Sequence, residues 1–136
     1  MEVKDLRIGN HVSFNDVWCK VIGIDKDRVL VEYHNGDTDY CHIDYIEPIE
    51  LTGDILIKTG FFKRSYHEIY FITPCVGCYD YYISYQNIKD NKYSFVASGY
   101  KNGELKRRIR LDNIKYLHEL QNIFFSFTNQ ELEMKL

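Results

Sequence analysis

The residues best placed to do chemistry are three basic side chains between Glu104 and Leu111. Lys106, Arg108 and Arg110 recur at every second position, which is the spacing that puts side chains on one face of a β-strand. Guanidinium and ammonium groups in such a row can bind phosphates or carboxylates. The row therefore predicts either an anion-binding face or a face that only meets solvent.

An aromatic residue is predicted to join this row through a hairpin. Asn102-Gly103 is typical of a two-residue turn, and such a turn pairs Phe95 with Arg110 on the neighbouring strand. A sheet face with arginines beside an aromatic ring can stack bases and bind phosphates. The candidate nucleic-acid or anion site consists of Lys106, Arg108, Arg110 and Phe95.

Two cysteines form a second candidate pattern, Cys75-Val76-Gly77-Cys78. This spacing lets two thiolates reach one tetrahedral metal ion or form a redox pair. A zinc site needs a second pair, however, and Cys19, Cys41 and His42 do not supply one at knuckle spacing. We therefore expect a hairpin tip with two small filler side chains, and no metal site and no cofactor.

Acidic residues around Asn35-Gly36 form a third pattern. If this dipeptide is a two-residue turn, Glu32, His34, Asp37 and Asp39 share one face and could hold a hard cation. The ligand order of a calcium loop is absent. The simpler interpretation is a solvated hairpin tip.

An enzyme is not favoured, because no known catalytic pattern is present. No glycine-rich phosphate loop precedes a helix, and the serines lack a nucleophile-elbow pattern. His118-Glu119 lies on a predicted helix, where we expect His118 at the edge of the apolar stripe. These serines are Ser65, Ser84, Ser94, Ser98 and Ser126.

Composition supports one compact protein with an uneven charge. The chain has 136 residues, 45% hydrophobic and 15% aromatic, with a net charge of −3. Residues 1–50 carry 5 basic and 11 acidic groups, and residues 51–136 carry 12 and 9. An anionic partner should therefore meet the second part. We expect no signal peptide and no membrane span, and the four cysteines then favour reduced thiols in the cytoplasm.

The first 50 residues predict a small β module of the SH3-like kind. Strand-like runs are separated by turn residues such as Asn35-Gly36, and Pro48 suits a closing edge strand. Aromatic residues of this module could line a groove for a peptide. The expected strands are Val17–Asp25, Arg28–His34 and Thr38–Ile43, and the aromatic residues are Phe14, Trp18, Tyr33, Tyr40 and Tyr45.

Residues 51–136 predict an antiparallel sheet with one long helix across it, so the fold class is α+β. Thr52 and Gly60 delimit a short helix before the sheet. In the long helix, Leu111–Thr128, the apolar residues recur at helical spacing, with a cap at Asp112 or Asn113. The expected strands are Tyr66–Thr73, Tyr79–Gln86, Tyr93–Tyr100 and Glu104–Leu111, with a final edge strand at Glu131–Leu136.

Several segments resemble a family of small uncharacterised proteins from Bacteroidetes, some of them encoded in prophage or mobile-element settings. The resemblance implies a shared fold and a cytoplasmic setting, and it implies no activity. The segments are Leu6–Asn10, Ile46–Thr52, Ile55–Phe61, Ile114–Asn122 and Glu131–Glu133.

From these patterns we predict a non-enzymatic binding or accessory protein, of prophage or mobile-element origin if the resemblance holds. Its partner is unidentified, with a protein favoured. The alternative is a weak nucleic-acid binder that uses the basic row and Phe95. The tyrosine-rich strand edges also allow the chain to self-associate.

Overall fold

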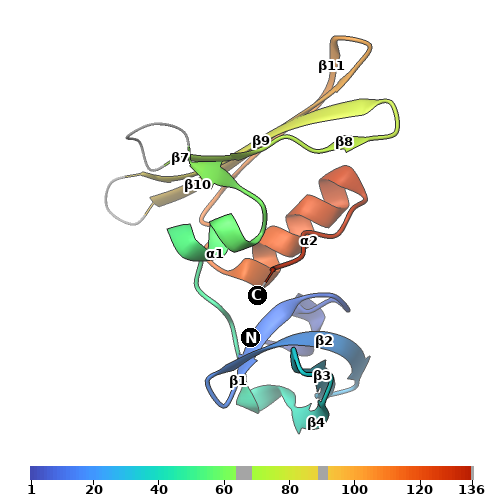
Figure 1. The fold of residues 1–136 in the computed structure, drawn as a ribbon, viewed down its shortest axis with the longest axis vertical. Coiled ribbons are helices and arrows are strands. Elements are labelled where there is room, and N and C mark those ends of the chain that lie inside the picture. Colours follow the sequence, from blue (N-terminus) through green and yellow to red (C-terminus); the bar gives the residue numbers. More distant parts are fainter. Residues whose placement is uncertain (64–68, 89–91, 136) are drawn as a thin grey trace.

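The computed structural model describes residues 1–63, 69–88 and 92–135. Its two β-sheets lie at opposite ends of the molecule, and two helices lie between them (Figure 1). All strand pairs in both sheets are antiparallel. The prediction of an α+β fold is therefore confirmed.

The first sheet has five strands in the order β4-β3-β2-β1-β5 and curves into a half-barrel (Figure 1). Its strands contribute to a hydrophobic cluster that includes Val12, Val21, Val29 and Val31, all with no exposed surface. Short 3-10 helices precede β1 and β5. The elements are η1 Val3–Asp5, β1 His11–Phe14, β2 Val17–Asp25, β3 Arg28–Glu32, β4 Thr38–His42, η2 Ile43–Tyr45 and β5 Ile46–Glu47.

The second sheet has six strands. Five follow the order β11-β10-β9-β7-β6, and the sixth, the short β8, pairs with β9. The predicted strand at Tyr66–Thr73 begins outside the described residues, and its described part forms β7. The strands are β6 Phe62–Lys63, β7 Ile69–Ile72, β8 Cys75–Val76, β9 Tyr79–Ile88, β10 Lys92–Lys101 and β11 Glu104–Asp112.

The short helix α1, Gly53–Lys58, begins as predicted, with Thr52 Oγ1 accepting a hydrogen bond from the Ile55 amide. The long helix α2, Leu117–Thr128, starts six residues later than predicted. Strand β11 extends to Asp112, and Asn113 has a left-handed φ of 69°, so neither residue caps the helix. Tyr116 takes that position instead, and its amide donates to Glu119 Oε1.

Helix α2 packs against both sheets (Figure 1). One side carries Leu117, Leu120, Phe124 and Phe127 into the core beneath the second sheet, as its apolar spacing predicts. The other side presents polar groups to the first sheet. This second role does not appear in the apolar pattern, because buried amides look like solvent-facing residues in a sequence.

Gln121 is the central polar contact between α2 and the first sheet. It has no exposed surface, and its Oε1 accepts a hydrogen bond from the His11 amide at 2.8 Å. Its Nε2 donates to His11 Nδ1 at 2.9 Å and to the Leu132 carbonyl at 2.8 Å. All the hydrogen-bonding groups of the amide are therefore used inside the protein.

The predicted final strand at Glu131–Leu136 is wrong for the described residues 131–135, which form no strand. Leu132 and Met134 are buried, so the alternation reflects two anchors in the core rather than a ladder. The charged residues that alternate with these two anchors form ion pairs with the N-terminal part of the chain. Glu131 forms a two-bond salt bridge with Arg7, and Glu133 lies 3.2 Å from Lys20 Nζ.

Among the described residues, no helix combines the length and the apolar character needed to cross a membrane. The four cysteines are free thiols; Cys19 and Cys41 are buried, and Cys75 and Cys78 are exposed. Burial raises the pKa of the Cys19 thiol to about 11.

Candidate binding face of the second sheet

The hairpin that joins β10 to β11 contains a β-bulge. Lys101 faces Glu104, as a two-residue turn at Asn102-Gly103 requires, but the register shifts between Gly99 and Tyr100. Beyond the shift, Gly99 faces Arg107 instead of Lys106. Lys106 is therefore an extra residue on β11, and beyond it the observed register differs by one residue from the predicted register.

Because of this bulge, the prediction that Phe95 lies on the same face as the basic residues is wrong. Phe95 pairs with Leu111 rather than Arg110 and has no exposed surface. It lies in the core with Ala97, on the side covered by α2. The residues opposite Arg108 and Arg110 are Ser98 and Val96. The two arginines are thus on the face away from the helix, with different neighbours.

The face of the second sheet that points away from α2 is called the outer face below. One row across it runs through Phe62 on β6, Phe71 on β7, Ser84 on β9 and Val96 on β10, and it ends at Arg110 on β11. These directly opposed residues share one face of the sheet. Four strand spacings make the row about 19 Å long.

A second row lies two residues further along the strands. Tyr82 pairs with Ser98, and Ser98 pairs with Arg108. The rings of Tyr82 and Tyr100 meet edge to face at a centroid distance of 5.4 Å, and those of Phe62 and Phe71 lie 6.1 Å apart. Aromatic side chains thus recur across the outer face.

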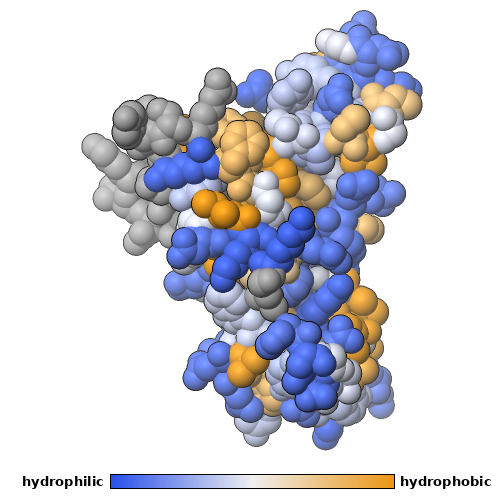
Figure 2. All heavy atoms as spheres, viewed as in Figure 1, coloured by the Kyte–Doolittle hydropathy of each residue, from blue (hydrophilic) through white to orange (hydrophobic). Residues whose placement is uncertain are grey.

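Between these rows lies an open trough of about 680 Å³. Tyr82 is 58% exposed and Phe62 is 49% exposed, which is high for large apolar side chains. In the view of Figure 2, hydrophobic atoms reach the surface over the second sheet. The trough is lined by Phe62, Lys63, Phe71, Thr73, Tyr82, Ile83, Ser84, Val96 and Ser98.

The three predicted basic residues are all exposed, but they are not equivalent. Lys106 lies in the bulge and pairs with Glu104 at 2.9 Å, and Arg110 Nε lies 3.4 Å from Asp112 Oδ1. Arg108 forms no hydrogen bond or ion pair with any residue that the structure describes. Arg107 points to the helix side, where it donates to the Phe127 carbonyl and covers its ring.

The cysteine pattern forms a hairpin tip, as expected. Cys75 pairs with Asp80 and Gly77 has a φ of 62°, as a tight turn requires. The expectation that the cysteines are fillers is wrong, because both are exposed. A hydrogen bond to Asp80 raises the pKa of Cys75.

The acidic hairpin does not form the predicted cluster. Glu32 pairs with Thr38 and Asp39 with Val31, so the register differs by one residue from that of a two-residue turn. The Tyr33 amide donates to the Asp37 carbonyl around the longer loop. Among the described residues, no three His, Cys, Asp or Glu side chains are grouped to hold a metal ion.

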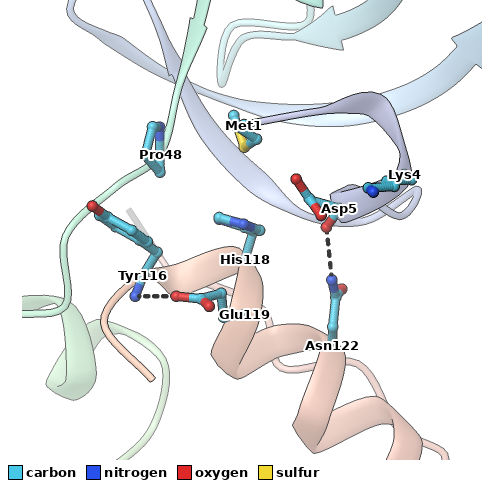
Figure 3. A pocket seen from close by; sticks show the side chains of 8 residues that line it. All are labelled: Met1, Lys4, Asp5, Pro48, Tyr116, His118, Glu119 and Asn122. Carbon is cyan, nitrogen blue, oxygen red and sulfur yellow. Dashed lines mark hydrogen bonds between the residues drawn. The ribbon is translucent and has the colours of Figure 1, made fainter. Parts of the chain in front are cut away.

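His118 lies in a second cavity, of about 460 Å³, between α2 and the start of the chain (Figure 3). The side chain is buried rather than at the edge of the helix, and burial lowers its pKa. Its Nδ1 has no hydrogen-bond partner among the described residues. Glu119 turns away to the Tyr116 amide (Figure 3). Within the described part of the chain, no carboxylate accepts a hydrogen bond from His118 Nδ1, which is the contact that orients the histidine of a catalytic triad.

The aromatic residues of the first sheet do not gather into one groove. Phe14 and Tyr33 pack against the first hydrophobic cluster, and Trp18 packs against the second. Tyr40 and Tyr45 are exposed. The outer face of the second sheet is therefore the more continuous aromatic surface.

Sequence reasoning missed the residues that form the trough, above all Phe62, Phe71 and Tyr82. The alternation in Tyr81, Tyr82, Ile83 and Ser84 weakly indicates that β9 has one buried face and one exposed face, but both faces carry aromatic residues. Period alone does not tell which of them lies under the helix.

Comparison of the chain with protein-family models, curated proteins and solved structures finds no match.

Proposed function

We propose that this protein is a non-enzymatic binding protein that holds its partner on the outer face of the second sheet. The observation that carries the proposal is the trough, where Phe62 and Tyr82 are half exposed although α2 fills the other side of the same sheet. Exposed apolar surface of this kind marks sites of interaction.

A binding role is also supported by the state of the most enzyme-like group. His118 is buried and its Nδ1 has no hydrogen-bond partner among the described residues, and Glu119 accepts hydrogen bonds from the Lys115 and Tyr116 amides at the start of α2. The trough itself offers hydroxyl groups and one lysine, which is a set suited to recognition.

The first sheet has a supporting role in this proposal. Its five short strands and the 3-10 turn before β5 support an SH3-like barrel, and its contacts with Gln121 and Glu131 fix it to the end of the molecule opposite the trough. It positions α2, and α2 supports the sheet that carries the trough.

Site-specific photo-crosslinking in cells of the source organism tests the proposal. Benzoylphenylalanine in place of Tyr82 should give a discrete adduct, and in place of Tyr45 it should give none. Both tyrosines are exposed, at 58% and 68%, but Tyr45 lies in the first half of the chain. The adduct should disappear when Phe62→Ser is added. Equal labelling from both positions, or none from position 82, contradicts the proposal.

A further inference from the structure

We infer that the partner on the outer face is a short stretch of single-stranded nucleic acid. This inference rests on the proposed function and names the chemistry of its partner. Three observations carry it: the aromatic rings, the hydroxyl groups between them, and the charges around them.

The aromatic rings offer surfaces on which bases can stack. Phe71 and Tyr82 come from neighbouring strands and lie on the same face, two residues apart in register. Unpaired bases stack on such rings whatever their sequence, since every base has a flat face. Duplex bases are already stacked on one another and cannot reach the floor of a trough. A single strand is therefore the form that fits.

The hydroxyl groups argue against a purely apolar partner. Ser84 and Ser98 lie between the aromatic side chains, and Thr73 lies at one end of the trough. An apolar helix or strand packed here would bury these hydroxyls without partners, which costs free energy. The edges of bases and sugars present donors and acceptors that can satisfy them.

The charges favour an anion. Arg108 and Arg110 end the two rows on the outer face, about 7 Å apart along β11, and Arg110 shares its charge with Asp112, 3.4 Å away. Lys63 is among the residues that line the trough. Among the described residues that line the trough, none carries a carboxylate. The acidic first half of the chain lies at the far end of the molecule (Figure 1). A phosphate backbone can thus follow the arginine edge while its bases enter the trough.

Fluorescence anisotropy with labelled twelve-nucleotide single strands of DNA and RNA tests the inference. We expect binding at 50 mM salt that weakens as salt rises, with a logarithmic slope of about −2 for three phosphate contacts. A duplex of the same length should bind more weakly. The purified full chain is used, and circular dichroism confirms that each variant is folded.

Two variants on the outer face and two matched controls locate the site. Tyr82→Ala removes a stacking surface and should weaken binding about tenfold, within the range for one stacked base. Arg108→Gln should reduce the salt slope by about 0.7. The controls Tyr45→Ala and Lys26→Gln remove an exposed tyrosine from η2 and an exposed lysine from the turn between β2 and β3. They should bind as the wild type does.

Three results would overturn the inference. One is flat titrations of both single strands at 50 mM salt. The other is binding that Tyr82→Ala and Arg108→Gln leave unchanged. A twelve-residue acidic peptide that binds more tightly than either oligonucleotide, and that loses affinity in Tyr82→Ala, would also overturn it. That last result would leave the proposed function intact, because the same face would bind a protein.

Discussion

Replacing Gln121 by leucine should destabilise the protein strongly, although the two side chains are similar in size. The substitution leaves three buried groups without a hydrogen-bond partner: the His11 amide, His11 Nδ1 and the Leu132 carbonyl. Each such group costs about 1 kcal/mol or more. The free energy of unfolding should therefore fall by about 3 kcal/mol, with little contribution from a cavity.

Urea unfolding of wild type and Gln121→Leu measures this loss. With an m-value of about 1.5 kcal/mol/M, the midpoint should move down by about 2 M. Trp18 is the only tryptophan and packs from the first sheet against the second cluster, so its fluorescence reports on the junction. Circular dichroism follows both sheets together.

Ser126→Ala is the matched control, because Ser126 lies on the same helix and is exposed. It should change the free energy of unfolding by less than about 0.5 kcal/mol. A loss below about 1 kcal/mol for Gln121→Leu would refute the argument. The amide would then be exchanging its partners for water rather than holding the two sheets together.

Three further predictions follow from other parts of the chain. Burial lowers the pKa of His11 below 6.5, so the folded protein binds fewer protons than the unfolded chain as the pH falls below that value. The urea midpoint should therefore fall as the pH drops below 6.5. Burial also lowers the pKa of His118, which should decrease the stability in the same direction. Equal midpoints at pH 7.5 and 5.5 would contradict this. Gly53→Ala should cost about 1–3 kcal/mol in the same assay, because the added Cβ overlaps Tyr70 Oη; an unchanged midpoint would show that the ring moves freely. A thiol reagent should label Cys75 and Cys78 rapidly and the other two cysteines only on unfolding, and Asp80→Asn should speed the labelling of Cys75.

Much of the fold follows from the sequence because local signals and tertiary structure agree. Strand β2 has the predicted bounds, Val17–Asp25, since turn residues lie on both sides of it. Helix α1 begins at the predicted cap and ends before Gly60. The apolar stripe of α2 packs on the second sheet as its spacing indicates.

The errors occur where one residue changes the register or where polar groups are buried. No local signal in β11 reveals the bulge, so the register of a regular hairpin predicts the wrong face of the sheet for Phe95. The loop around Asn35-Gly36 is longer than a two-residue turn for the same kind of reason. The burial of Gln121 and the position of the tail at Leu132 depend on contacts between residues more than ten positions apart. Such contacts leave no periodic pattern in the sequence.

The bulge at Gly99 also determines how the hairpin tolerates insertions and deletions. Deleting Lys106 while keeping the Asn102-Gly103 turn would leave Gly99 paired with Arg107 and Phe95 paired with Leu111, as in the intact chain. The ladder between β10 and β11 would then be regular. This deletion therefore removes the bulge, and every side chain of β11 beyond it stays on the same face of the sheet. Deleting Arg108 instead would leave the bulge but shift Ile109 and Arg110 by one position, sending the guanidinium toward the helix and the isoleucine into water. Two shortened chains of equal length and equal formal charge should thus differ in solubility.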